Sequence, residues 1–108
     1  MKVVFLHDAE EDLKELRKYI VPKFGKDTWL EAKHQIKTAA KSLAALSQSG
    51  HIPDELAELG MAQYRQVISG MNRIIYEVRG DLLHVHIVCD MRRDLRDMLA
   101  RRLLHAGQ

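Results

Sequence analysis

Residues 72–104 hold three arginines of interest, Arg73 near the start of the stretch and the adjacent Arg92 and Arg93 further along it. Arginine presents a planar fork of N–H donors that suits phosphate and carboxylate groups. The stretch has the pattern of two short strands joined by a tight turn and followed by an arginine-rich helix. It therefore places the three guanidinium groups near one another at the end of a small sheet, and predicts recognition of a large anionic or macromolecular target.

Two histidines, His84 and His86, alternate along the second of these strands and share one face with Glu77 and Arg73. They could serve as an acid–base pair or as metal ligands. Because the spacing shows no convincing third ligand, we predict no metal and no cofactor. We expect a solvated or partner-covered strand face on which Glu77 pairs across the strands with His84.

Length and composition predict one domain over residues 1–108, with 46% hydrophobic and 30% charged residues. No apolar run reaches the length of a membrane span, and the opening MKVVFL is interrupted at once by HDAEEDLKE, unlike a secretion signal. We therefore expect a soluble, cytoplasmic protein. The single cysteine, Cys89, lies in an apolar strand and is expected to be a buried structural thiol.

The net charge of +2 is unevenly distributed along the chain. All eight lysines lie in the first 41 residues, whereas eight of the nine arginines follow residue 60. Lysine suits a solvated helix face and arginine suits bidentate recognition, so the second half is the expected recognition region. The alternative is a basic side without a function.

Hydrophobic spacing predicts the elements of the first half. A strand over Lys2–Leu6 precedes a helix capped by Asp8, which Pro22 should end because the residue before a proline is pushed out of helical conformation. A second helix capped at Thr28 carries an apolar stripe as far as Leu46. The two helices should form an antiparallel hairpin, followed by a loop over residues 47–53.

The second half is predicted to be β-rich and to end in a helix. A strand over residues 63–68 precedes a hairpin whose turn is Gly80–Asp81, and the final helix starts near Arg93–Asp94. The facing of Arg65 depends on the loop length at Ser69–Gly70 and stays open. The predicted hairpin pairs, with both members facing the helices, are Val78 with Leu83, Tyr76 with Val85, Ile74 with Ile87 and Asn72 with Cys89. The opposite face is predicted to hold Arg73, Ile75, Glu77, His84, His86 and Val88.

These residues and this element order resemble the RelE/ParE superfamily of bacterial type II toxin-antitoxin toxins. YRQVISGMNRIIYEV, residues 64–78, is similar to the family's arginine-containing middle strands, and VHIVCDMRRDLRDMLARRL, residues 85–103, to its last strand and tail. The resemblance implies an α+β fold in which an N-terminal strand and a helical hairpin pack on a small antiparallel sheet with a C-terminal helix. The tail resembles ParE most closely, through Arg92, Asp94, Leu95, Leu99, Arg102 and Leu103.

The ParE resemblance implies a growth-inhibiting toxin that poisons DNA gyrase by protein contact and is neutralised by a cognate antitoxin. No catalytic residue is assigned. The residues expected to bind partners are Arg73, Arg92, Arg93, Asp94, Leu95 and Leu99. The arginines are expected to be exposed, so that removing their charge weakens toxicity without unfolding the domain. The antitoxin is expected in the concave side of the sheet and along the helical hairpin, through an acidic, amphipathic segment.

The alternative is a RelE-like endonuclease that cuts mRNA on the ribosome. Its candidate catalytic residues would be Arg65, Arg73, His84, His86 and Arg92. The tyrosine that often precedes the strand arginine in RelE-like sequences is Asn72 here, and the terminal helix carries Leu95 and Met98 where a catalytic tyrosine would be expected. We therefore favour the ParE-like interpretation.

Overall fold

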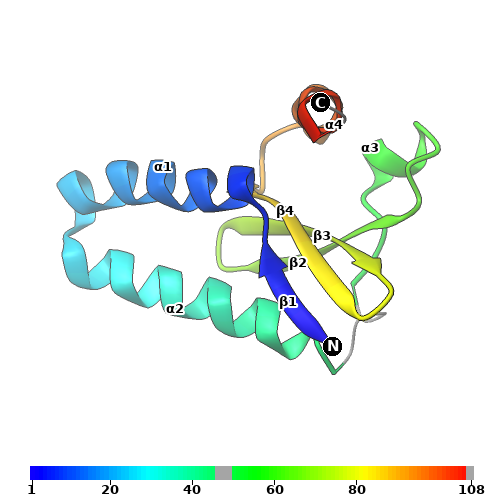
Figure 1. The fold of residues 1–108 in the computed structure, drawn as a ribbon. Helices are drawn as coiled ribbons and strands as arrows, with labels where there is room; N and C mark the ends of the chain where they lie inside the picture. Colours follow the sequence, from blue (N-terminus) through cyan, green and yellow to red (C-terminus); the bar gives the residue numbers. More distant parts are fainter. Residues whose placement is uncertain (46–49, 107–108) are drawn as a thin grey trace.

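A computed structural model describes residues 1–45 and 50–106, with side chains up to Arg102. The chain forms a four-stranded sheet with two long helices on one side and a C-terminal helix on the other (Figure 1). None of the helices in this described part is long and apolar enough to cross a membrane. The elements are β1 (Lys2–Phe5), α1 (His7–Phe24), α2 (Lys26–Ser42), α3 (Asp54–Ala57), β2 (Tyr64–Ser69), β3 (Asn72–Arg79), β4 (Leu82–Asp90) and α4 (Leu95–Ala106).

The helical hairpin is confirmed, but its boundaries differ from those predicted. No side chain caps either helix, and Thr28 bonds the carbonyl of Phe24 instead. Pro22 lies inside α1, where it removes one N–H in the last turn without ending the helix. Gly25 ends it, with φ of 92°, a conformation that glycine adopts without strain. α2 ends at Ser42, before the end of the predicted apolar stripe. Leu46 and residues 47–49 of the predicted loop lie outside the described residues.

The sheet has the order β1-β4-β3-β2 and is mixed rather than antiparallel, because β1 runs parallel to β4. The predicted turn at Gly80–Asp81 is confirmed, as are the pairs Val78 with Leu83 and Tyr76 with Val85. Beyond them a bulge shifts the register. Ile75 pairs with Ile87, which leaves His86 without a partner opposite it on β3.

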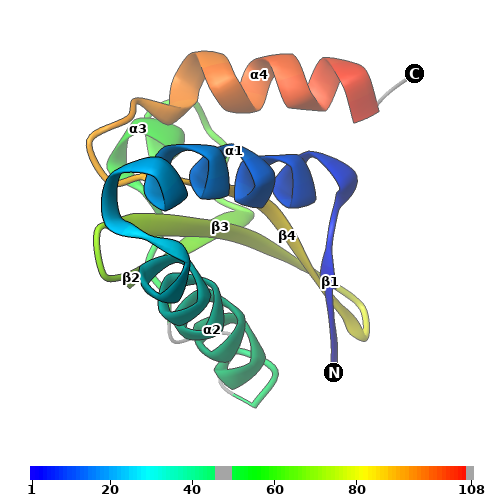
Figure 2. The same ribbon diagram turned by 90° about the vertical axis from the view of Figure 1, so that its left-hand side faces the viewer.

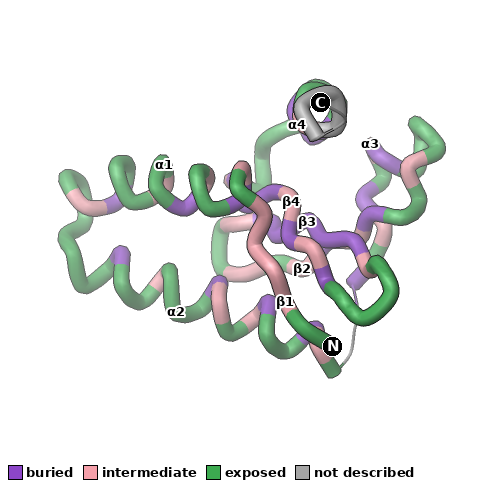
Figure 3. Tube along the Cα trace, in the orientation of Figure 1, coloured by how far each residue is buried: buried purple, intermediate pink, exposed green. Residues whose placement is uncertain are grey.

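Because of this bulge, the last residues of β4 face the opposite way from the prediction. Ile87 and Cys89 turn away from α1 and α2, and Val88 turns toward them. On the other side of the sheet they meet α4 and α3, so this face is covered by helices rather than by solvent. Figure 2 is seen from the opposite side, with α1 and α2 in front of the sheet. Figure 3 shows the buried residues concentrated along β3 and β4, between the two layers. The α+β fold therefore has two apolar cores.

The facing of Arg65, left open by the sequence, follows from the two-residue turn between β2 and β3. Arg65 pairs with Tyr76, whose ring belongs to the core under α1 and α2. The Arg65 Nη1 donates to the carbonyl of Gly50 at 2.9 Å. Arg65 therefore lies on the hairpin side of the sheet and ties the loop before α3 to β2.

Candidate functional site

A groove of about 590 Å³ runs between α1 and α4 at the end of β3 and β4. Arg92 and Arg93, two of the predicted recognition residues, lie in its wall together with acidic and apolar side chains of α1. It is the candidate site for a partner, and we call it the α1–α4 groove. Its lining residues are Asp12, Glu15, Leu16, Tyr19, Asn72, Val88, Cys89, Asp90, Arg92, Arg93, Met98 and Arg102.

Arg92 and Arg93 follow β4 after Met91 and are both exposed, but their guanidinium groups differ in their contacts. The Arg92 Nε and Nη2 donate to the two carboxylate oxygens of Asp90, at 2.9 and 3.2 Å. These bonds lower the pKa of Asp90 and raise that of Arg92. Among the described arginines after residue 60, Arg93 is the one whose side chain makes no hydrogen bond or ion pair.

Arg73 is not the exposed recognition residue that the sequence predicted. It is 8% exposed, on the face of β3 that turns toward α3 and α4. Its Nε donates to Gln66 Oε1 at 2.7 Å, Nη1 to the Arg93 carbonyl at 2.9 Å, and Nη2 to the Glu55 carboxylate. All three guanidinium nitrogens are used inside the protein. Arg73 therefore joins β2, α3 and the segment before α4.

The residues at the start of α4 divide between surface and core. Asp94 is exposed and accepts the backbone N–H of Arg96 at 2.8 Å, the contact of an N-cap residue. Leu95 and Leu99 are 0% exposed and pack against the sheet. A partner cannot reach them while α4 stays docked, and their expected role in partner binding stays a prediction.

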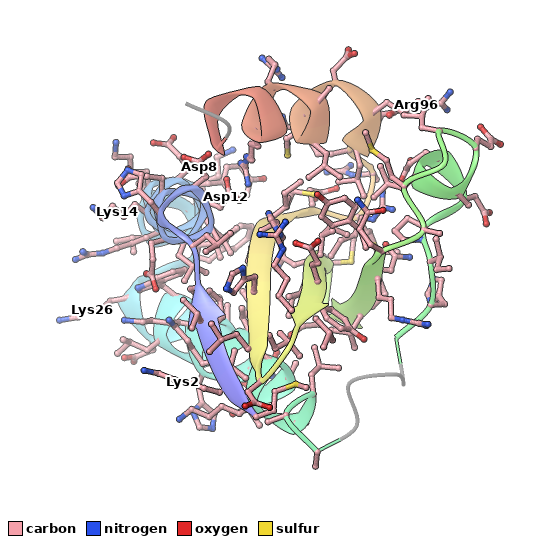
Figure 4. All side chains as sticks on the ribbon, turned by 45° about the vertical axis from the view of Figure 1, so that its right-hand side comes forward. Lys2, Asp8, Asp12, Lys14, Lys26 and Arg96 are labelled. Carbon is pink, nitrogen blue, oxygen red and sulfur yellow. The ribbon has the colours of Figure 1, made fainter. Side chains whose placement is uncertain are left out.

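An acidic side of α1 faces the arginines of α4, a feature that the sequence analysis missed. Asp8, Glu11, Asp12 and Glu15 recur at helical spacing and line a second hollow with Arg93, Arg101 and Arg102. Figure 4 shows Asp8 and Asp12 on the side of α1 that faces α4. The spacing of the four acids was visible in the sequence and could have indicated this contact. Part of the positive charge of the second half is thus balanced within the chain.

Glu77 lies opposite His84 across the strands, as predicted, but its side chain contacts His86. Glu77 lies opposite His84 in the sheet, but its Oε1 is 3.0 Å from His86 Nε2 and 3.2 Å from Arg79 Nε. Burial lowers the pKa of His86, and it outweighs the opposite effect of Glu77. The side chains of Glu77 and His86 are 9% and 11% exposed, so the expected solvated strand face is in fact largely buried.

The candidate catalytic residues of an RNase are not gathered at one point. Arg65 lies on the hairpin side of the sheet, whereas Arg73 lies on the opposite side and is held by Glu55. His86 is held by Glu77, and Arg92 by Asp90. A phosphoryl-transfer site needs its acid, base and cationic groups around one reacting phosphate, and Arg65 lies on the opposite face of the sheet from Arg73 and His86.

The chain combines a strand, a helical hairpin, a three-stranded meander and a terminal helix with an arginine-bearing groove, and it is of the small α+β class. The chain matches the family described as ParE toxin of type II toxin-antitoxin system, parDE, over residues 3–95, and it belongs to that family. It also resembles the solved structure of the "Chromosomal ParDE TA system from P. aeruginosa", with a TM-score of 0.70, 18% identity and coverage of 83% of this chain and 95% of that chain. This second likeness shows the shared fold.

No curated protein matches the chain. Membership of the ParE family makes the protein a ParE-like toxin of a type II toxin-antitoxin system, and it implies a cognate antitoxin as partner.

Proposed function

We propose that this toxin inhibits DNA gyrase in the cytoplasm by protein contact, and that it is not an enzyme. The observation that carries the proposal is the α1–α4 groove, which presents arginines at its rim while the candidate RNase residues stay apart on two faces of the sheet. The known role of ParE toxins, inhibition of gyrase, supports the same conclusion. A toxin of this kind acts by occupying its target, so its surface rather than a reacting centre decides its activity.

Arg93 is the residue that we expect to matter most in the groove. Its guanidinium is exposed and makes no hydrogen bond or ion pair with any described residue. A carboxylate or phosphate of the target can therefore bind it without first breaking an internal contact. Arg92 would first have to break its ion pair with Asp90, so we expect it to contribute less to target binding than Arg93.

The antitoxin is proposed to cover exposed apolar residues of the helical hairpin. Tyr19, Phe24 and Leu30 are 54%, 60% and 48% exposed, and Tyr19 also lines the groove. An amphipathic segment lying along α1 would bury Tyr19 and place acidic side chains near Arg92 and Arg93. Target and antitoxin then compete for the same groove, which accounts for neutralisation.

A gyrase assay with the purified toxin tests this function. Wild-type protein is expected to inhibit supercoiling and to promote linear DNA, and Arg93→Ala to weaken both effects about tenfold, as for the loss of one charged contact. Arg17→Ala, which removes an exposed arginine of α1 outside the groove lining, is the matched control and should keep full activity. A protein that leaves gyrase untouched but cuts mRNA in a ribosome-bound assay would contradict the proposal and favour the RelE-like alternative.

A further inference from the structure

We infer that Glu77, His84 and His86 form a binding site for a divalent metal ion of the zinc class, a site that is independent of gyrase inhibition. Each side chain offers one ligand atom, and these atoms all lie within 4.8 Å of one another. Spacing along the sequence gave two histidines and no convincing third ligand. Pairing of the strands supplies the third, because Glu77 of β3 lies directly opposite His84 of β4.

The three ligands share one face of the β3–β4 hairpin. His84 and His86 are two residues apart on β4, and the bulge leaves His86 without a partner opposite it on β3. His86 thereby comes to 3.0 Å from Glu77, measured from Nε2 to Oε1. In tetrahedral geometry the ligand atoms of a zinc ion stand about 3.3 to 3.6 Å apart, given metal–ligand bonds of roughly 2.0 to 2.2 Å. The Glu77–His86 pair needs to open by a few tenths of an ångström to form one edge of such a shell, and a side-chain movement of His84 would complete the other two.

The surroundings hold two of the ligands in place. The ring of Tyr64 meets the His86 ring edge to face, with centroids 5.2 Å apart and planes at 88°. Tyr64 lies opposite Glu77 in the sheet, so Tyr64, Glu77 and His84 form one row across three strands. His84 is less buried than Glu77 and leaves a path for the ion. A ligand set that is positioned before binding loses little side-chain entropy when the ion arrives.

The donor set selects the kind of metal. Two imidazole nitrogens and one carboxylate suit zinc, cobalt and nickel, whereas magnesium and calcium prefer oxygen ligands alone. Three protein ligands leave coordination positions for water. The Glu77 carboxylate is largely buried, and its partners are His86 and the exposed side chain of Arg79, which can leave it for solvent.

Arg79 supplies a discriminating variant, since its Nε is 3.2 Å from the same Glu77 oxygen that would bind the ion. The guanidinium must leave this oxygen when the ion binds. Arg79→Gln removes the competing charge and is expected to tighten metal binding several-fold. The same charge change at exposed Arg17 of α1 would strengthen a purely surface attraction equally, so tighter binding in Arg79→Gln than in Arg17→Gln is the expected result.

Titration of the untagged, chelator-treated full-length chain with cobalt chloride tests the site. We expect one equivalent to bind with visible absorption bands, and zinc chloride, but not magnesium chloride, to raise the melting temperature. His84→Ala should weaken binding by at least about tenfold, whereas His34→Ala, at an exposed histidine of α2, should bind as the wild type does. Glu77→Gln keeps the side-chain shape and should also weaken binding. Thermal unfolding without metal checks that the variants fold. Equal binding by His84→Ala and the wild type, or no binding of one equivalent, would overturn the inference.

Discussion

Arg102 of α4 donates two hydrogen bonds to the carboxylate of Asp12 of α1, from Nη1 at 2.8 Å and from Nη2 at 2.5 Å. The pair also completes the edge of β4. β1 ends at Phe5, and beyond that point Asp12 accepts the N–H of Val88 at 2.9 Å while Arg102 donates to the carbonyl of His86 at 2.7 Å. Two side chains thus take the place of a continuing strand next to the bulge, and they fix α4 against α1.

Breaking this pair should loosen α4 from the sheet. Asp12→Ala leaves the Val88 N–H without an acceptor and leaves the Arg102 guanidinium with the His86 carbonyl alone, so we expect a loss of about 2 kcal/mol in the free energy of unfolding. Arg102→Lys retains the charge but not the two-pronged contact, and its cost should be smaller but measurable. Chemical denaturation of each single variant and of the double variant provides the measurement. Additive effects would contradict a direct coupling between the two residues.

The Arg73 contacts predict that this arginine stabilises the fold. Arg73→Ala would leave Glu55, Gln66 and the Arg93 carbonyl without their donor in a largely buried place, at a cost of about 3 kcal/mol. Arg92→Ala is the control, because that side chain is 82% exposed, and its melting temperature should equal that of the wild type. Equal melting temperatures for the two variants would show that the buried network contributes no stability.

Local patterns predicted the β3–β4 turn and the pairs nearest to it, because a glycine in the turn and strict alternation of apolar residues act over a few positions. They did not predict the bulge at His86, where contacts from Asp12 and Arg102, distant in sequence, accompany the shift in register. The expected surface role of Arg73 was wrong for a related reason. Its acidic partner, Glu55, lies on α3, a helix of four residues that leaves no periodic signal.

The exposure of Arg92 and Arg93 was easier to predict from the sequence. Arg92 and Arg93 follow the last strand and precede the helix cap Asp94, a position that sequence spacing indicates well. Arg93 and Arg92 have the same residue type and are neighbours, so no sequence pattern says which one is already paired. The contact between Asp90 and Arg92 is what distinguishes the two arginines. It depends on the backbone turn that brings the Arg92 N–H to within 2.9 Å of the Asp90 carboxylate.

Cys89 should react slowly with thiol reagents in the folded protein. Burial raises its pKa from 9.0 to about 11, so the reactive thiolate is rarer in the native state than in the unfolded chain. We expect slow reaction with an aromatic disulfide reagent at pH 8 and reaction at the rate of a free thiol in denaturant. Above pH 9 the unfolded chain loses this proton more readily, so the thiol disfavours the native state as the pH rises toward 11. Rapid native labelling at pH 8 would contradict this account.

The last prediction concerns the antitoxin. Its toxin-binding segment should be acidic and amphipathic, and association should slow as salt is added, because Arg92 and Arg93 attract it over a distance that salt screens.

Phe24→Ser removes a side chain that is 60% exposed on the helical hairpin, and it should weaken antitoxin binding while leaving the melting temperature of the free toxin unchanged. Leu59→Ser, at a leucine that is 50% exposed just after α3, is the matched control and should bind as the wild type does. Copurification with the neighbouring gene product and stopped-flow measurement of the association rate would test both statements. If Phe24→Ser and Leu59→Ser bind equally well, the antitoxin does not use the hairpin. If no complex forms with the neighbouring product while the free toxin is a well-behaved monomer, the chain does not act in a toxin-antitoxin pair.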